Sequence, residues 1–105
     1  MMRFHNKLYI GESIKHPIRV KWKLRIGAGQ LQVHVIVVSN NQSNQLECFH
    51  NGLLKQKFFR KQELLVVGIA GDYSEAVSLI TQITEECVKE TGTGNIKDFL
   101  LKEKS

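Results

Sequence analysis

The chain has 105 residues, of which 42% are hydrophobic and 24% are charged, and these values fit one globular domain over 1–105 with no room for a second. Fifteen Lys and Arg oppose ten Asp and Glu, which gives a net charge of +5 and permits acidic partners without requiring them. The longest apolar run, 64–71, is far shorter than the roughly 20 residues of a membrane-spanning helix. Residues 1–7 also lack the pattern of a secretory signal, so we expect a cytoplasmic protein without membrane partners.

The N-terminal part of the chain predicts strands. Leu8–Ile14 is a candidate first strand, with Gly11 as a candidate bulge. Residues 18–26 then alternate strictly, because every even position is apolar and every odd position is basic, which is typical of a half-buried strand. Turn-forming residues follow, and 31–38 is rich in β-branched side chains. The pattern predicts a hairpin of 18–26 with 31–38.

The register of this hairpin can be derived from its turn. A turn centred on Ala28-Gly29 brings apolar residues opposite each other in four pairs, and it leaves the basic residues on the other face of the hairpin. The four pairs are Ile26–Leu31, Leu24–Val33, Trp22–Val35 and Val20–Val37. The register predicts that Trp22 is buried beside Val35 and that the other face of the hairpin is basic, and it leaves open whether that face is exposed or covered.

The middle of the chain predicts two further strands. The polar segment 39–45 is expected to be a surface connection, and Leu46–His50 is expected to be a short strand. Residues 53–62 have no clear period, so they receive no assignment. Leu64–Ala70 is an apolar run of strand length and predicts a strand well inside the sheet.

The C-terminal part predicts helices. Apolar residues recur at helical spacing from 73 to 91, Asp72 with Glu75 has the spacing of a capping box, and Gly92 is placed to end the helix. A short terminal helix is expected over about 96–103. The order predicts an α+β fold, in which an antiparallel sheet of about four strands is built on the 18–26/31–38 hairpin and packed on one face by the two helices.

Charge is distributed unevenly along the chain, with +9 over residues 1–61 and −4 over residues 62–105. Four basic residues alternate along the predicted strand 18–26 and would form a row about 20 Å long that could follow a phosphate backbone. A second basic segment lies in 55–61 and contains two phenylalanines. The candidate nucleic-acid-binding residues are Arg19, Lys21, Lys23, Arg25, Lys55, Lys57, Arg60 and Lys61.

The same basic face also has a simpler interpretation, as a solvated surface or one that meets an acidic protein or the acidic helix of a second copy. RNA-binding sheets commonly add aromatic side chains to the basic face, whereas the predicted register turns Trp22 to the core. Our first expectation is therefore a non-enzymatic interaction or scaffold module that forms a homodimer through the sheet edge or the apolar helix flank. Nucleic-acid binding through the basic sheet face is the alternative.

Other chemistries have weak support. Cys48 and His50 share one face of a strand and His34 could lie near them, but a single Cys-x-His pair is a poor signal for zinc or for a cysteine nucleophile. Residues 68–72 join a strand to a helix, yet their spacing fits neither the P-loop nor the dinucleotide fingerprint. We expect free thiols at Cys48 and Cys87, no catalytic residues, no metal and no cofactor.

Overall fold

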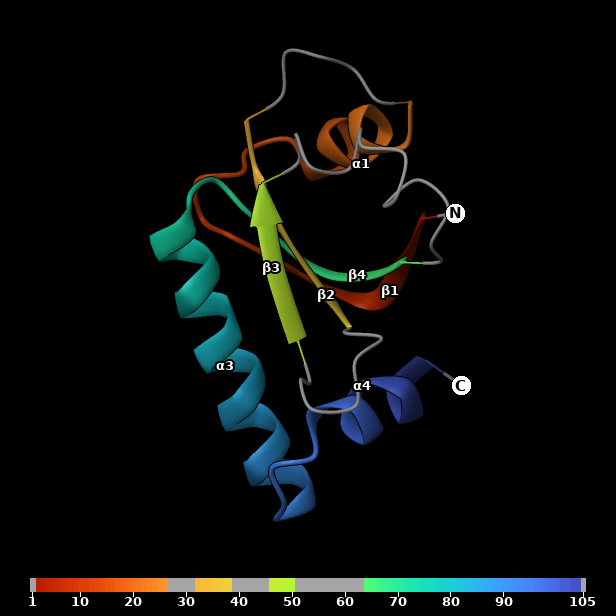
Figure 1. The fold of residues 1–105 in the computed structure, drawn as a ribbon, viewed down its shortest axis with the longest axis vertical. Coiled ribbons are helices and arrows are strands. Elements are labelled where there is room, and N and C mark those ends of the chain that lie inside the picture. Colours follow the sequence, from red (N-terminus) through yellow and green to blue (C-terminus); the bar gives the residue numbers. More distant parts are fainter. Residues whose placement is uncertain (1, 27–31, 39–45, 51–63, 105) are drawn as a thin grey trace.

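The computed structural model of the protein describes residues 2–26, 32–38, 46–50 and 64–104. In these residues a strand and a helix come first, three strands follow, and two helices end the chain (Figure 1). The elements are β1 (Met2–Ile10), α1 (Pro17–Ile26), β2 (His34–Val38), β3 (Leu46–His50), β4 (Leu64–Ala70), α3 (Tyr73–Thr91) and α4 (Ile96–Lys104).

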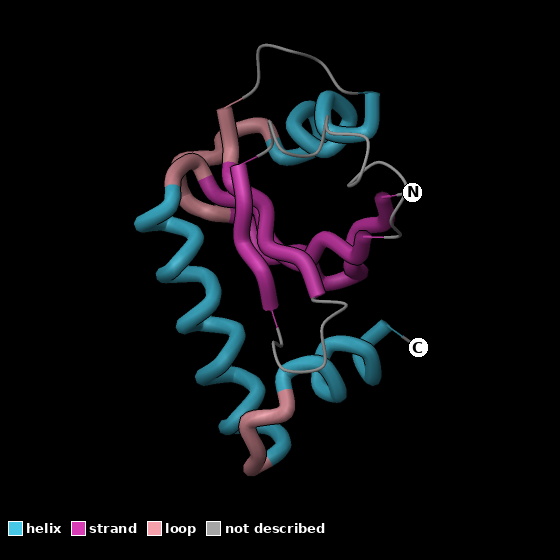
Figure 2. Tube along the Cα trace, in the orientation of Figure 1, coloured by secondary structure: helices cyan, strands magenta, loops and turns pink. Residues whose placement is uncertain are grey.

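The four described strands form one sheet in the order β1-β4-β2-β3 (Figure 2). β2 pairs antiparallel with β3 on one side and with β4 on the other, whereas β1 pairs parallel with β4. The predicted α+β class, the sheet size of about four strands and the strands at 46–50 and 64–70 are confirmed. The sheet is mixed rather than wholly antiparallel, because β1 joins it in the parallel direction.

Helices cover both faces of the sheet. Successive residues of a strand point to opposite faces, so Ile36 packs in one core cluster while its neighbours Val35 and Val37 pack in another. The first cluster contains residues of α3 and α4, and the second contains Leu24 of α1 with Val20 packed against it. The predicted helical cover on one face is therefore joined by a third layer on the other face.

The layer formed by α3 and α4 is the better packed one. Ile83 and Cys87 of α3 and Leu100 of α4 are fully buried against the sheet. As predicted, Asp72 caps the start of α3, because its side chain accepts from the Glu75 amide at 2.8 Å. Gly92, also as predicted, ends α3 in the left-handed conformation with φ of 73°, which a residue with a Cβ adopts at a steric cost.

A bulge in β4 sets which of its residues face each helical layer. Ile36 pairs with Gly68 but Val37 pairs with Val66, so Val67 is an extra residue in β4. A Cβ on Gly68 would lie 2.9 Å from Cδ1 of Ile36, so a larger residue at this position would require the Ile36 side chain to shift.

The predicted strand at 18–26 is wrong, because these residues form the helix α1. A hairpin needs a free edge on β2, and both edges of β2 are already paired with β3 and β4. Pro17 stands at the first helical position, where its fixed φ and missing N–H are tolerated. The alternating sequence satisfies a helix as well, because Val20 and Leu24 are four residues apart and share its inner side.

Two further expectations change with this correction. Trp22 is not buried beside Val35, since 63% of its surface is exposed. The first strand is Met2–Ile10 rather than Leu8–Ile14, and Gly11 lies beyond it, with its amide bonded to the Ile69 carbonyl at 2.9 Å. The strand predicted at 31–38 covers His34–Val38, and residues 39–45 and 53–62 lie outside the described part of the chain.

Candidate nucleic-acid interface

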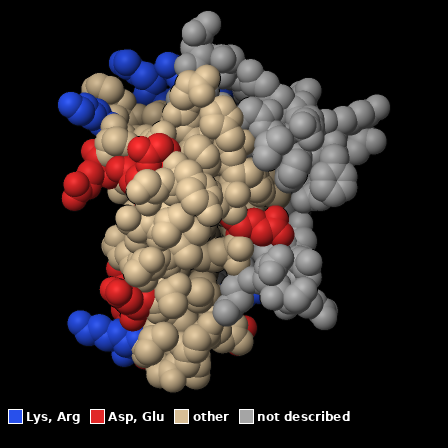
Figure 3. All heavy atoms as spheres, turned by 60° about the vertical axis from the view of Figure 1, so that its left-hand side comes forward, with Lys and Arg blue, Asp and Glu red and all other residues tan. Residues whose placement is uncertain are grey.

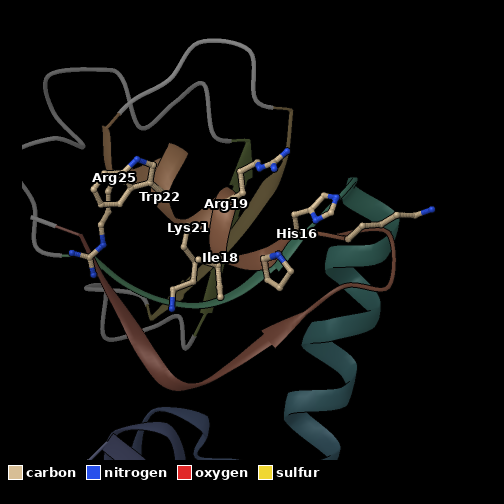
Figure 4. A pocket seen from close by; sticks show the side chains of 8 residues that line it. His16, Ile18, Arg19, Lys21, Trp22 and Arg25 are labelled. Carbon is tan, nitrogen blue, oxygen red and sulfur yellow. The ribbon is translucent and has the colours of Figure 1, made fainter.

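The surface of α1 and the turn before it form an open groove with a volume of about 760 Å³. Its cationic lining comes from Lys15, Arg19, Lys21 and Arg25, with His16 beside them. Figure 4 shows that these side chains extend from α1 and from the residues just before it. The groove is strongly positive, because these cations line it and the first turn of α1 contains no acidic residue.

Two large apolar side chains are exposed in the middle of this basic surface. Ile18 is 83% and Trp22 is 63% exposed, and both line the groove. At about 100° per residue, Ile18, Lys21, Trp22 and Arg25 fall within an arc of about 100° around the helix. We call these four residues the Trp22 face. An exposed indole set among cations is a combination that polyanion-binding proteins use.

The cations of the Trp22 face are held by an aromatic side chain of the sheet. Lys21 Nζ lies 5.2 Å and the Arg25 guanidinium carbon 5.1 Å from the ring centroid of Phe4 in β1. Each such cation–π contact contributes roughly 0.5–1 kcal/mol at an exposed site. The two like charges, four residues apart on one ring, also repel each other by a few tenths of a kcal/mol, on the order of 0.2–0.5. A bound anion would relieve that repulsion.

The basic residues of this surface lack acidic partners within the described ranges. The described residues include an ion pair between Lys7 Nζ and Glu86 Oε1 at 3.1 Å, and it lies on the side of the sheet opposite α1. Neither Lys21 nor Arg25 takes part in a salt bridge in the described part of the chain. The positive charge of α1 is therefore uncompensated there.

The four candidate residues of the predicted basic row are brought together on one helix, not on one sheet face. In the helix, Lys21 and Arg25 lie on the Phe4 side, whereas Arg19 and Lys23 follow each other four residues apart on the opposite flank of Trp22. Of these four, Arg19, Lys21 and Arg25 line the groove. The other candidates, Lys55, Lys57, Arg60 and Lys61, lie outside the described residues.

The prediction missed Ile18, Trp22 and Phe4 as members of this site. The strand register assigned Trp22 to the core, although the spacing of Ile18 and Trp22 by four residues is equally a helical signal. Pro17 at the head of the segment was a further indication of a helix. Phe4 could not be found in this way, because its contact with α1 depends on the tertiary structure.

The strand-to-helix turn at 68–72 is filled by the protein's own carboxylates. Glu75 accepts from the Gly71 amide at 2.7 Å, from the Ser13 hydroxyl at 2.6 Å and from the Ser13 amide at 3.0 Å. The Ser13 and Gly71 hydrogen bonds hold the pKa of the Glu75 carboxyl below its ordinary value. Because two carboxylates occupy the start of α3, this turn does not offer a phosphate site.

The histidines and Cys48 do not assemble a metal centre in the described residues. His34 and His50 face each other across β2 and β3, with ring centroids 5.4 Å apart in an edge-to-face arrangement. Within those residues no group of three or more His, Cys, Asp or Glu side chains is placed to hold a metal ion. Burial raises the pKa of the Cys48 thiol, which disfavours the thiolate that a nucleophile requires. Cys48 and Cys87 are both free cysteines.

Comparisons with known proteins found no matching family, curated protein or solved structure. In the described part of the chain, none of the helices combines the length and the apolar composition needed to cross a bilayer. The function must therefore be argued from the surface itself.

Proposed function

We propose that the protein is a small non-enzymatic binding module that holds a nucleic acid on the surface of α1. The observation that carries this proposal is the exposed Trp22, surrounded by Arg19, Lys21 and Arg25 without an acidic partner among the described residues. Phosphates supply the negative charge that this surface lacks, and their contact with Lys and Arg releases counterions. The sheet-face interface expected from the sequence is replaced by a helical one.

The proposal is tested by the salt dependence of binding. A fluorescently labelled oligonucleotide is titrated with the protein at several salt concentrations, and binding is followed by anisotropy. Four phosphate contacts predict a logarithmic slope of about −3, since each contributes about −0.7 on a single strand and slightly more on a duplex. Binding that is absent at low salt, or that does not change with salt, would contradict the proposal.

A matched pair of variants locates the site. Changing Lys21 and Arg25 to Gln removes two charges from the groove, and changing Lys89 and Lys97 to Gln removes two charges from α3 and α4. Both double variants have the same net charge, but we expect only the first to reduce the slope, by about 1.4. Equal losses in the two variants would mean that binding follows overall charge and has no site on α1.

Self-association is a second candidate function, because α3 exposes an apolar stripe. Tyr73, Val77 and Val88 are exposed large hydrophobic residues, and with Ile80 and Thr84 they repeat at steps of three and four along α3. Figure 3, which brings the α3 side forward, shows mostly uncharged atoms in the middle of this face, with both acidic and basic residues at its margins. Such a stripe suits the helix of a second copy.

The homodimer is tested by sedimentation equilibrium at high micromolar concentration and moderate salt. We expect a dimer mass for the natural sequence and a monomer mass after Val77→Glu and Val88→Glu, since both sites are exposed and both changes place charge on the stripe. A monomer mass for the natural sequence would remove this candidate.

A further inference from the structure

We infer that the nucleic acid bound by α1 is single-stranded, with one base stacked on Trp22 and an adjacent phosphate held between Lys21 and Arg25. This inference rests on the proposed function and names its substrate class. It depends on three features of the described residues: the exposed indole, the pair of cations fixed by Phe4, and the composition of α1.

The indole is available for stacking. Trp22 is 63% exposed in the middle of a helix of ten residues, so one ring face can meet a base without a rearrangement of the core. An unpaired base has a free π-face, and its stacking on an aromatic side chain is independent of sequence. In a duplex the base faces are already stacked, so an exposed indole would gain little there.

The cations lie where the phosphate next to such a base would be. Lys21 precedes Trp22 directly and Arg25 follows it by three residues, which places all three on the Trp22 face. Their contacts with Phe4, at 5.2 and 5.1 Å, restrict the two side chains before any ligand binds. A phosphate between them would then lose less side-chain entropy on binding than one held by two free lysines.

The composition of α1 disfavours readout of a duplex. Base edges in the major groove are recognised mainly by Arg, Lys, Asn and Gln and by short polar side chains. The helix, PIRVKWKLRI, contains no Asn, Gln, Ser or Thr, so of these base readers it offers Arg and Lys alone, which also bind phosphates. Its exposed large hydrophobic residues, Ile18 and Trp22, suit stacking and contact with unpaired bases.

A membrane surface is the competing partner, because interfacial helices also combine Trp with Lys and Arg. Such helices bury a broad apolar face, whereas the described side chains of α1 include two exposed large hydrophobic residues, Ile18 and Trp22, between its cations. The observations favour the single strand, and the membrane becomes an outcome of the test.

The chain contains a single tryptophan, so selectively excited tryptophan emission reports on this site alone. The protein is titrated at low salt with an oligothymidylate, with a duplex of the same length, and with vesicles of phosphatidylcholine and phosphatidylglycerol. We expect the single strand to quench the emission and to bind at least tenfold more tightly than the duplex. Equal binding of the duplex without quenching would overturn the inference and leave the proposed function intact.

The remaining outcomes are also decisive. If neither nucleic acid binds, the proposed function fails together with the inference. A blue shift with vesicles, without binding of either nucleic acid, would replace both by a membrane-surface role.

Two variants separate stacking from charge. Trp22→Ala is followed by anisotropy, and we expect it to weaken single-strand binding about 5- to 150-fold while leaving the salt slope unchanged. Trp22→Phe is expected to recover part of that loss, whereas Lys21→Gln should reduce the slope by about 0.7. Ser78→Ala changes an exposed side chain of α3 that lies outside both proposed surfaces and is expected to change neither quantity. An unchanged affinity of Trp22→Ala would contradict the stacking role.

Discussion

The two helices α1 and α3 lie against opposite faces of the same sheet, and they bury very different shares of their side chains. α3 has a capping side chain at its start, a left-handed glycine at its end and four buried residues. Of the α1 side chains that the structure describes, Leu24 is buried and Ile18 and Trp22 are exposed. The comparison teaches that α3 contributes most to the core, whereas α1 exposes side chains that the core does not need and that are available for binding.

The two helices also differ in the partners of their charged side chains. Two carboxylates of α3 are engaged, since Glu75 accepts from Gly71 and Ser13 and Glu86 accepts from the Tyr9 hydroxyl at 2.7 Å. The Tyr9 hydrogen bond lowers the pKa of the Glu86 carboxyl. By contrast, Lys21 and Arg25 of α1 lie over the Phe4 ring and form no salt bridge with a described acidic residue. We therefore expect stability to depend on α3 and binding to depend on α1.

The largest expected difference concerns Ile83 and Trp22. Ile83→Ala leaves a cavity in the fully buried cluster and should lower the free energy of unfolding by about 2–5 kcal/mol. Trp22→Ala removes an exposed side chain and should change it by no more than about 0.5 kcal/mol. Urea unfolding measures both, and similar losses would show that α1 is part of the stabilising core after all.

A smaller effect is expected at His5, which joins β1 to α4. Its buried ring accepts from the Lys7 amide at Nδ1, so Nε2 carries the proton and donates to the Leu100 carbonyl at 2.7 Å. His5→Ala removes both contacts and should cost about 1–3 kcal/mol. The exposed neighbour Asn6 is the control, and a loss for Asn6→Ala as large as that for His5→Ala would contradict the assignment.

Glu75 is expected to give an effect of about 1 kcal/mol that depends on pH. Its pKa is lowered in the folded protein from the ordinary value of 4.5, so its contribution is present above that value and is lost as the pH falls through the folded pKa. Glu75→Gln should therefore be less stable than the natural sequence at neutral pH. The difference, measured by urea unfolding between pH 3 and 7, should shrink toward the acid end of that range; a constant difference would mean that ionisation of Glu75 is irrelevant.

The last effect on stability concerns the pair Lys21→Gln and Arg25→Gln. Loss of the two contacts with Phe4 removes about 1–2 kcal/mol, and relief of the repulsion between the two cations returns about 0.2–0.5 kcal/mol. The double variant should therefore be less stable than the natural sequence by about 0.5–1.8 kcal/mol in thermal or urea unfolding. A larger loss would indicate that the cations hold α1 to the sheet, and their removal could not then be used to test binding alone.

The contrast between α1 and α3 also explains which secondary structure could be predicted from the sequence. In α3 the apolar stripe, Asp72 and Gly92 all indicate one helix with the same ends, so local signals agree with the fold. Residues 18–26 satisfy a strand and a helix equally well, and the choice is made elsewhere, because β4 and β3 occupy both edges of β2.

The candidate site could likewise be predicted only in part from the sequence. The basic residues of α1 could be listed from the sequence, but their grouping depends on the secondary structure. Their contact with Phe4 depends on the position of β1, which no local pattern encodes.

The division of roles between the two helices is tested most directly by a nuclear magnetic resonance titration. The ¹⁵N-labelled protein is titrated with an oligothymidylate, and the amide and indole shifts are followed along the chain. We predict that the largest shifts occur over residues 15–25 and at the Trp22 indole N–H, while the amides of α3 stay unchanged. Shifts concentrated on α3, or an unshifted Trp22 indole in the saturated complex, would contradict the assignment of binding to α1.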